Sequence, residues 1–323
     1  MIGSAKEIAR WIESHDDIAV IVHFRPDGDA YGCALALTQA IRALGKRAFP
    51  ACDDPVEPKY RFLPGWEDFQ TADSIPFSPK AALGADVSEP SRMGKLSALF
   101  DACASRAVID HHATNTGFGD ACYVAEDAAA AGELVLEVIE ALGLALTPDM
   151  ALCVYTAVST DSGNFSFKST SANTYRAAAE CVAAGLDVEE ATRVLYRTRS
   201  LAKTRLLGSA LNRIEMYEGG KVALVRITNA MYAETGATRP ESHGIVNYLN
   251  EIEGVRVGIL AEELDDGVKF SFRAAGGTNV AALAQVFGGG GHVAAAGANV
   301  FHTTLDEIVP QVIRAAAECA SRV

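Results

Sequence analysis

Aspartate and histidine residues lie at the ends of several separate apolar segments of this chain. They fall into four groups along the sequence: His23, Asp27 and Asp29; Asp86; Asp110, His111 and His112; and Asp161. Each group alone has an ordinary explanation as a polar turn, a strand end or a helix end. Four groups with the same placement make coincidence improbable, and they predict one site where the side chains meet.

The side chains in these groups have the chemistry of metal ligands. Four carboxylates and two imidazoles are enough for two divalent cations if one carboxylate bridges them. Mixed oxygen and nitrogen donors without thiolate suit Mn²⁺ and also accept Mg²⁺, Co²⁺, Zn²⁺ or Fe²⁺. Two such ions roughly 3.5–4 Å apart can activate a shared water and hold the attacking and leaving oxygens of a phosphoryl group. The residues therefore predict hydrolysis of a phosphate ester.

The segments that would carry these groups alternate between strand and helix. Helices are predicted at 4–15, 31–44, 128–142, 148–160, 171–184 and 187–197, and strands at 18–22, 48–52, 81–85 and 106–109. Residues 53–79, rich in Pro, Asp and Phe, look irregular. Strand alternating with helix over this length indicates a doubly wound, mostly parallel α/β sheet. Ligands bind such sheets at the carboxyl ends of the strands, where these side chains would lie.

The rest of the chain predicts a smaller α/β domain. Strands are expected at 221–227, 255–263 and 268–273, and helices at 242–251 and 279–287. The glycine run Gly288–Gly291 and His292 then precede a predicted helix of small residues and a final helix from Leu305. We expect a first domain at 1–190, a helical linker at 191–215, a second domain at 216–323, and the active cleft between the domains. The basic residues of the linker are read as a solvated helix face.

Composition narrows the class of protein. The chain has 323 residues, which favours two domains, and a formal charge of −13. A protein that grips long duplex nucleic acid needs a basic surface, so that class is disfavoured. No apolar run of membrane-spanning length is present. Seven scattered cysteines without a C-x-x-C pair indicate reduced thiols and a cytoplasmic location.

Five motifs in order resemble the DHH phosphoesterase superfamily. They are His23-x-x-Pro26-Asp27-x-Asp29-Ala30-x-Gly32, Asp86, Asp110-His111-His112, Asp161-Ser162-Gly163, and Gly288-Gly289-Gly290-Gly291-His292. More narrowly, the chain resembles the RecJ-like proteins with a C-terminal DHH-associated domain, the nanoRNase/pAp-phosphatase group. The resemblance covers nearly the whole chain. Cys33 and Ser162 depart from the usual Ser and Thr, and neither is a metal ligand in the family scheme.

The resemblance implies a role for each motif residue. One metal would be held by His23, Asp27 and Asp86, and the other by Asp29, Asp86, His111 and Asp161, with Asp86 as the bridge. His112 would face the substrate phosphate as hydrogen-bond donor or general acid, so that Asp86 and His112 form the catalytic pair. Asp110 would support the histidines from behind.

The second domain would hold the rest of the substrate. Gly289, Gly290 and Gly291 would offer backbone N–H groups to an anion, with His292 at the start of the following helix. Arg273, at a predicted strand end, suits bidentate contact with a phosphate. Arg92, shortly after Asp86, is a further candidate for the same task.

The expected activity is Mn²⁺-dependent hydrolysis of short nucleotides. The substrates would be oligoribonucleotides of a few units, linear dinucleotides such as pApA, and the 3′-phosphate of the bisphosphate pAp. A cyclic-dinucleotide phosphodiesterase acting on c-di-AMP is the alternative enzyme, and a catalytically silent nucleotide-binding regulator is the alternative from another class. Net charge and size disfavour a RecJ-like exonuclease on long strands, and the glycine-rich motif disfavours an inorganic pyrophosphatase. Substrate length, polarity, the native metal and a homodimeric state stay open.

Overall fold

The computed structural model describes residues 2–321 and divides into two compact units, Met1–Thr198 and Arg199–Val323. The division falls inside the stretch 191–215, for which a helical linker was expected. Unit 1 and unit 2 each contain one six-stranded sheet covered by helices. The chain is therefore a two-part α/β protein, as the strand and helix patterns predicted, and each unit is described separately below.

The sheet of unit 1 is mostly parallel. Its strands are β1 (Ile2–Gly3), β2 (Ile18–Ile21), β3 (Ala48–Ala51), β4 (Ala81–Ala85), β5 (Ser105–Asp110) and β6 (Ala121–Val124), in the order β1-β6-β5-β4-β2-β3. Only the edge strand β1 runs antiparallel to its neighbour. The chain passes from β2 outward to β3 and then returns to β4 on the other side of β2. This reversal between β2 and β4 is where doubly wound sheets bind ligands, and the predicted fold class is confirmed.

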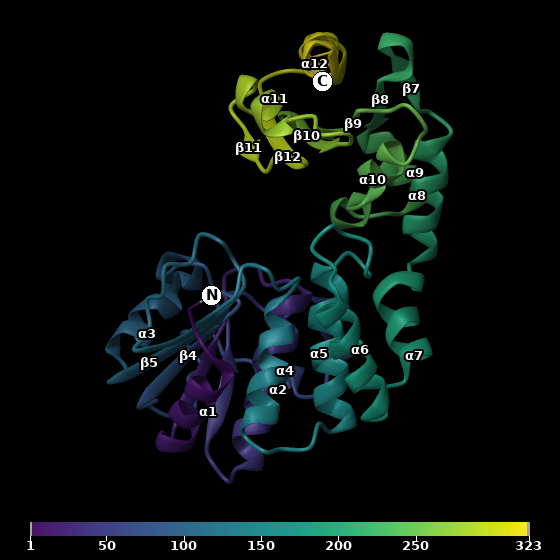
Figure 1. Ribbon diagram of the computed structural model, residues 1–323. Coiled ribbons are helices and arrows are strands. Elements are labelled where there is room, and N and C mark those ends of the chain that lie inside the picture. Colours follow the sequence, from purple (N-terminus) through teal and green to yellow (C-terminus); the bar gives the residue numbers. More distant parts are fainter. Residues whose placement is uncertain (1, 322–323) are drawn as a thin grey trace. The chain divides into compact units, whose positions relative to one another are not determined.

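Helices lie on both faces of this sheet (Figure 1). The helices of unit 1 are α1 (Ala5–Ser14), α2 (Gly28–Ala43), α3 (Ser97–Ala102), α4 (Ala131–Ala141), α5 (Pro148–Asp161), α6 (Ala172–Ala183) and α7 (Val188–Thr192), and α5 and α6 pack against other helices. Alternate residues of β2 enter two separate cores, Ile18 and Val20 on the side of α2, Ala19 and Ile21 on the side of α3. This alternation follows from the two-residue period of a strand, and it explains why the strand is apolar throughout. Segment 53–79 contains only two short 3₁₀ turns and the isolated bridge of Gln70 to Ala51.

Glycines allow three helices of unit 1 to pack closely. A Cβ atom at Gly32 of α2 would lie 2.3 Å from the Cys153 carbonyl oxygen of α5, and one at Gly132 of α4 would lie 2.6 Å from the Ala157 methyl group. Any other residue would force these helices apart. A Cβ at Gly28, the first residue of α2, would also meet Thr160 near the end of α5. The N-termini of α2 and α4 and the C-terminus of α5 therefore lie at one edge of the sheet.

The sheet of unit 2 is mixed. Its strands are β7 (Glu215–Tyr217), β8 (Val222–Ile227), β9 (Val257–Leu264), β10 (Gly267–Ala274), β11 (Gly290–Gly291) and β12 (Ala295–Phe301), in the order β11-β12-β10-β9-β8-β7. Among these pairs, β8 and β9 are parallel and the others antiparallel. One core contains residues of α8 (Leu201–Leu211), α9 (Asn229–Thr235) and α10 (Ile245–Asn250). The core on the other face contains residues of α11 (Val280–Val286) and α12 (Leu305–Ser321).

The prediction of a helix after His292 is wrong. Residues 295–301 form strand β12, and β11 pairs with it through Gly290 and Gly291. The amide of His292 donates to the Ala295 carbonyl at 2.8 Å, so this segment is a tight hairpin. Small residues suit the strand because Ala296 and Ala298 face the core, and a Cβ at Gly289 would lie 2.1 Å from the Gly297 carbonyl oxygen. Alanine and glycine carry no periodicity that distinguishes such a strand from a helix.

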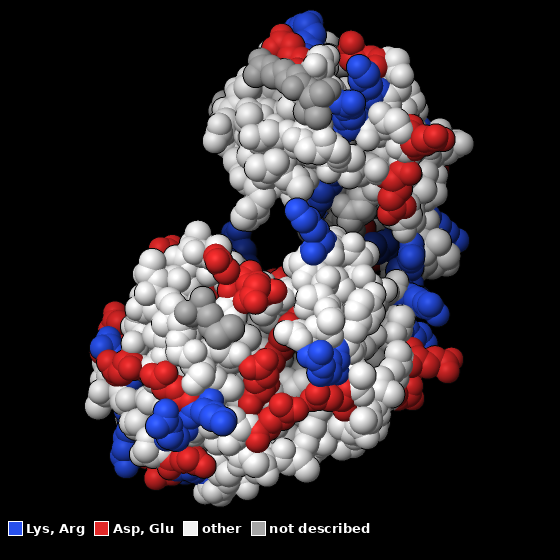
Figure 2. Space-filling view, viewed as in Figure 1, with Lys and Arg blue, Asp and Glu red and all other residues white. Residues whose placement is uncertain are grey.

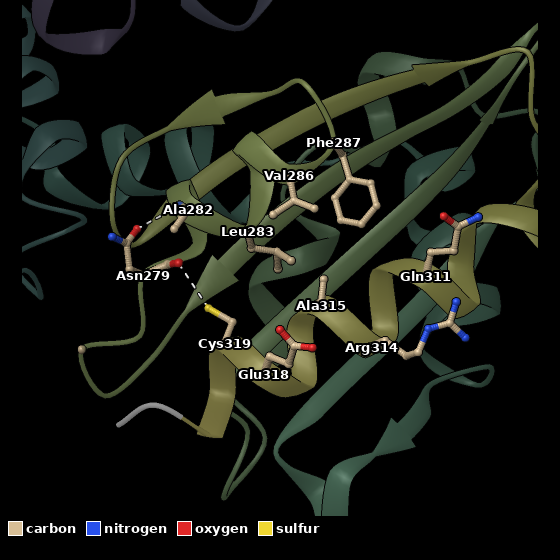
Figure 3. A pocket seen from close by; sticks show the side chains of 11 residues that line it. Asn279, Ala282, Leu283, Val286, Phe287, Gln311, Arg314, Ala315, Glu318 and Cys319 are labelled. Carbon is tan, nitrogen blue, oxygen red and sulfur yellow. Dashed lines mark hydrogen bonds between the residues drawn. The ribbon is translucent and has the colours of Figure 1, made fainter.

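A groove of about 680 Å³ lies between α11 and α12 on unit 2 (Figure 3). Leu283, Val286 and Phe287 form one wall, and Ala315 and Arg314 line the other. None of the residues predicted to take part in the chemistry lines it.

Among the residues that the structure describes, none of the helices combines the length and the apolar character needed to cross a membrane.

Candidate metal centre

The ends of five elements of unit 1, β2, α2, β4, β5 and α5, hold the aspartates and histidines together. His23 follows β2, and Asp27 is the N-cap of α2, accepting hydrogen bonds from the amides of Asp29 and Ala30 at 3.0 and 3.2 Å. Asp29 lies in the first turn of α2, which begins three residues before the helix predicted at 31–44. Asp86 follows β4 with a left-handed backbone, φ +54°, a conformation that costs energy for a residue other than glycine.

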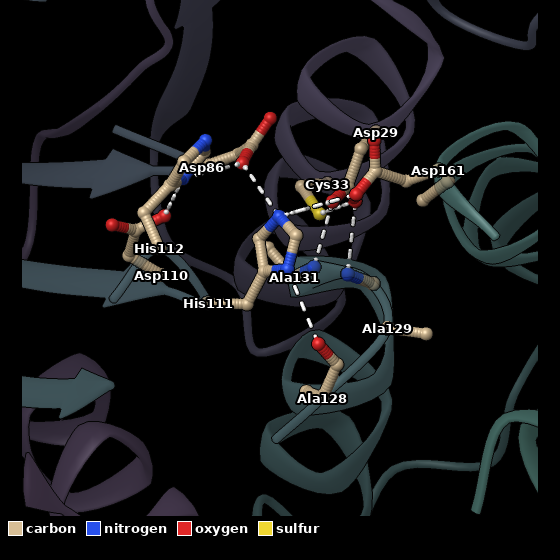
Figure 4. Close-up of polar contacts among 12 residues, drawn as sticks. Asp29, Cys33, Asp86, Asp110, His111, His112, Ala128, Ala129, Ala131 and Asp161 are labelled. Carbon is tan, nitrogen blue, oxygen red and sulfur yellow. Dashed lines mark hydrogen bonds and ion pairs between the residues drawn. The ribbon is translucent and has the colours of Figure 1, made fainter. Parts of the chain in front are cut away.

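Asp86 belongs to two of three overlapping sets of possible metal ligands. Figure 4 shows the imidazole of His111 between Asp86 and the pair Asp29 and Asp161. The first set is His23, Asp27 and Asp86, the second is Asp29, His111 and Asp161, and the third is Asp86, His111 and His112; the ligand atoms of each set lie within 4.8 Å of one another. The Oδ2 atom of Asp86 lies 3.5 Å from Nε2 of His23, and its Oδ1 atom lies 3.6 Å from Nε2 of His111. The structure therefore brings together six residues that come from distant parts of the sequence.

Backbone carbonyls orient the two imidazoles toward the carboxylates. The Nδ1 atom of His23 lies 2.8 Å from the Phe24 carbonyl oxygen, and Nδ1 of His111 lies 3.3 Å from that of Ala128. A carbonyl accepts a hydrogen bond only from a protonated nitrogen, which leaves the Nε2 lone pair of each ring for a metal. Nε2 of His111 lies 3.3 Å from Oδ2 of Asp161 and 3.7 Å from Oδ2 of Asp29.

Asp29 is fixed by the N-terminus of α4. Its Oδ2 accepts the amide of Ala131 at 2.7 Å, and its Oδ1 accepts the amide of Gly132 at 3.0 Å. The thiol of Cys33, one turn along α2, donates to Oδ1 at 3.1 Å. Free N–H groups at a helix start carry partial positive charge and favour a carboxylate. The glycine-mediated packing of α4 therefore supports the metal centre directly.

The negative charge of the cluster is not balanced within the protein. Burial and the neighbouring Asp86 and Asp161 hold the pKa of Asp29 well above its ordinary value, and burial raises the pKa of Asp161 to about 6. Burial also acts to raise the pKa of Asp86, but hydrogen bonding to His23 and the charge of His111 lower it overall. The Oδ1 atom of Asp86 has no hydrogen-bond partner, although this residue is only 2% exposed.

These features fit divalent cations. A buried carboxylate oxygen without a partner is costly, and several carboxylates in one buried cluster repel each other. Positive ions would remove both penalties, and oxygen and imidazole donors without thiolate are the set that hard and borderline divalent metals prefer.

His112 is held from behind by a buried chain of hydrogen bonds. Its Nδ1 donates to Oδ1 of Asp110 at 2.8 Å, and the side-chain Nδ2 of Asn115 donates to Oδ2 of Asp110 at 2.7 Å. Asn115 also donates to the Val87 carbonyl at 2.9 Å, next to Asp86. The hydrogen bond to Asp110 raises the pKa of His112 to about 9. Sequence reasoning missed Asn115, whose only signal was its position three residues after the two histidines.

A small cavity of about 110 Å³ opens at the cluster. Arg92 and Ser88 line it together with His112 and several of the aspartates. The guanidinium carbon of Arg92 lies 4.5 Å from the centre of the Phe24 ring, and the Phe24 amide donates to the Arg92 carbonyl at 2.7 Å. Arg92, a candidate from the sequence, is therefore placed at the cavity, and Ser88 is a lining residue that the sequence did not indicate.

The other predicted substrate residues lie in unit 2. Arg273 is near the end of β10, paired in register with Ala295 of β12. His292 is paired with the same Ala295 through the hairpin. Gly289, Gly290 and Gly291 belong to the hairpin and not to a helix N-terminus, so the expected helix dipole is absent there. Their contact with a substrate stays a prediction.

Two family models match the chain. The DHH family N-terminal domain matches residues 17–158, and the DHHA1 domain matches residues 202–320. Among curated proteins, the bifunctional oligoribonuclease and PAP phosphatase NrnA of Thermus thermophilus is 34% identical over 308 residues, covering 94% of this chain and 90% of that protein. The protein of the same name from Bacillus subtilis is 28% identical, covering 91% and 93%.

Solved structures agree with this assignment. An exopolyphosphatase-related protein from Bacteroides fragilis matches with a TM-score of 0.88 at 25% identity, covering 98% of this chain and 97% of that one. The exonuclease RecJ bound to manganese matches in fold with a TM-score of 0.55 at 15% identity, covering 100% and 96%. From the two family models and the 34% identical relative, the chain belongs to the DHH family, with an N-terminal DHH domain followed by a DHHA1 domain.

Proposed function

We propose that this protein is a two-metal phosphoesterase that hydrolyses short oligoribonucleotides and linear dinucleotides to mononucleotides and removes the 3′-phosphate of pAp. The observation that carries the proposal is the position of Asp86, which shares one ligand set with His23 and Asp27 and lies 3.6 Å from His111 of another, with a buried oxygen that has no hydrogen-bond partner. The name of the relatives, bifunctional oligoribonuclease and PAP phosphatase, supports the choice of substrates. Such a function fits the acidic net charge of −13, because short substrates need only local positive charge.

We assign one cation to His23, Asp27 and Asp86 and the other to Asp29, Asp86, His111 and Asp161. Manganese is our choice among the divalent ions, because it tolerates mixed oxygen and nitrogen donors. When bound, such a pair of ions activates water for attack on phosphorus and neutralises charge on the phosphoryl oxygens. Asp29 and the two histidines are already oriented by backbone groups, so the centre is preorganised before any ion binds.

The remaining groups act on the substrate. His112, with Nδ1 occupied by Asp110, presents Nε2–H to a phosphate oxygen or to the leaving oxygen, as donor or general acid. Arg92 at the cavity would bind a non-reacting phosphate oxygen. Arg273, His292 and the glycine hairpin of unit 2 would bind the rest of the nucleotide, with backbone N–H groups of the hairpin replacing the helix terminus that was expected.

One panel of substrates tests this proposal. The full-length protein with Mn²⁺ is incubated with pAp, pApA, c-di-AMP and RNA of two to ten units, and the products are separated by chromatography. We expect release of AMP from pAp and of mononucleotides from the shortest RNAs, and loss of both activities in Asp86→Asn. Asp73→Asn, an exposed change of the same charge, serves as the control.

Other outcomes of the panel would favour the alternatives. Turnover of closed c-di-AMP without preference for linear substrates would indicate the cyclic-dinucleotide phosphodiesterase. Binding of nucleotides without turnover of any substrate would indicate the regulator, although no ligand position of the cluster is missing.

We also propose a cytoplasmic location and leave a homodimer as a prediction. Cys33, Cys52, Cys103, Cys122, Cys153 and Cys181 are buried free thiols, which fits a reducing compartment. On the face seen in Figure 2, the Lys and Arg side chains of unit 2 are interspersed with Asp and Glu, which does not favour a long duplex as partner. Analytical ultracentrifugation would give the oligomeric state.

A further inference from the structure

Arg273 carries a positive charge without an acidic partner. It is partly buried near the end of β10, and no carboxylate of the described residues pairs with it. Arg226 in the same sheet is comparably buried but contacts Glu215 at 2.8 Å and Asp306 at 3.0 Å. Burial lowers the pKa of Arg273, whereas for Arg226 the acidic neighbours outweigh burial and raise it. The two arginines thus differ in whether the protein itself compensates their charge.

The contacts that Arg273 does make are with neutral oxygens. Its Nε donates to Oδ1 of Asn247 at 3.1 Å, and its Nη1 donates to the carbonyl of Phe272 at 3.0 Å. A guanidinium has five N–H groups, so three remain for a ligand. These three lie on the Nη1 and Nη2 side, which is the side that can bind two oxygens of one phosphate.

Helix α10 holds Asn247 in place against β10. Asn250, one turn further along the same helix, donates to the carbonyl of Ala274 at 3.1 Å, the residue after Arg273. Leu249 of α10 is fully buried, and a Cβ at Gly258 of β9 would lie 3.1 Å from its side chain. The helix is therefore packed closely on the sheet, and Asn247 is a fixed acceptor for Arg273.

We propose that Asn247 is a positioning residue that directs Arg273 toward a phosphate of the nucleotide substrate while leaving its charge uncompensated. The inference rests on the proposed function, because it requires that Arg273 contacts the substrate. An amide oxygen orients the guanidinium through one hydrogen bond and leaves its net charge at +1. A carboxylate in the same place would orient it equally well but would compete with the substrate anion.

The chemistry of the acceptor gives a sharp test. Asn247→Asp keeps the shape of the side chain and converts the neutral acceptor into a counter-ion for Arg273. We expect KM for pApA and pAp to rise about tenfold or more, with kcat changed less than threefold, because the reacting phosphate is bound by other residues. Asn247→Ala should raise KM less, since it removes orientation but adds no competing charge.

Two further variants separate charge and structure from the proposed contact. Asn299→Asp adds the same charge on β12, where Asn299 is exposed and paired with Lys269, four residues along β10 from Arg273. It should leave KM and kcat unchanged. In an Arg273→Ala background, Asn247→Asp should have no further effect on KM, a result that a purely structural role of Asn247 would not give.

Each result has one reading. If Arg273→Ala raises KM and Asn247→Asp does not, the inference about Asn247 is refuted while the proposed function stands. If Arg273→Ala leaves KM unchanged with active enzyme, the substrate contact itself is refuted. If circular dichroism shows that Asn247→Asp does not fold, the double-mutant cycle of Asn247→Ala with Arg273→Ala replaces it. In that cycle, additive effects of the two substitutions on KM would overturn the proposal.

Discussion

Replacing Asp161 by Asn should have opposite effects on stability with and without metal. Burial raises the pKa of Asp161 from its ordinary value near 4 to about 6, so its ionised form is unfavourable in the metal-free fold. A rise of this size corresponds to about 3 kcal/mol. The side chain is 34% exposed, and screening by water reduces the cost to about 1 to 2 kcal/mol.

The pH dependence fixes the sign of this effect. A carboxyl group whose pKa is raised by folding costs nothing below its ordinary pKa near 4, and the cost grows as pH rises until the group is ionised above about pH 6. Metal-free Asp161→Asn should therefore melt about 2 to 6 °C higher than the wild type at pH 7.5. At pH 4 the two proteins should melt together.

Manganese should reverse the order. A ligand at 100 times its Kd stabilises the fold by about 2.7 kcal/mol, and Asp161→Asn removes a charged ligand of one ion. With excess Mn²⁺ we therefore expect the wild type to melt above the variant. The assay is thermal melting of the full-length protein, dialysed against chelator and then titrated with Mn²⁺, with Asp73→Asn as control. A variant that is less stable without metal at pH 7.5 would refute the argument that uncompensated charge strains this cluster.

Three further outcomes follow from named contacts. Gly32→Ala should destabilise the fold by about 3 kcal/mol in urea unfolding, because its Cβ would meet the Cys153 carbonyl. Gly208→Ala in α8, where a Cβ meets open space, should stabilise the fold by about 0.5 kcal/mol. Equal effects of the two substitutions would contradict the packing argument. Glu262 is buried and accepts hydrogen bonds from Tyr232, Ser242 and Lys269. Burial acts to raise the pKa of Glu262, but these donors lower it overall. Glu262→Gln should therefore reduce the free energy of unfolding by about 2 to 4 kcal/mol at pH 7, and the difference should shrink as pH falls below about 4.5 and the wild-type carboxylate becomes protonated. Asn115→Ala should lower kcat about 10- to 100-fold in steady-state assays without changing the metal content, and loss of metal instead would show that Asn115 acts on the ligands.

The ends of β2, β4 and β5 in unit 1 could be predicted because each has two independent signals. A continuous apolar run marks a strand buried on both faces, and Asp or His directly after it marks the edge where ligands bind. For β2, β4 and β5 these two signals coincide, and the structure brings their terminal residues together. The helix α5 was predicted because Thr147-Pro148 is a clear helix start, and Thr147 caps it by accepting the Met150 amide.

Other features had no local signal. Strand β6 has only four residues and was missed, and Asn115 gains its role only through contacts with Asp110 and Val87 across the fold. The hairpin at 288–295 was predicted as a helix start because alanine and glycine suit both conformations. Its structure is decided by pairing with β12 and by the core beneath Ala296 and Ala298, which are tertiary contacts that a single sequence does not display.

The metal content of the purified protein tests the central claim most directly. The protein is saturated with Mn²⁺, freed of excess ion by gel filtration, and measured by inductively coupled plasma mass spectrometry together with electron paramagnetic resonance. The account predicts two Mn²⁺ ions per chain with an exchange-coupled spectrum in the wild type, and loss of that coupling in Asp86→Asn. A single ion per chain would contradict the account. Two uncoupled ions that both remain bound in Asp86→Asn would also contradict it.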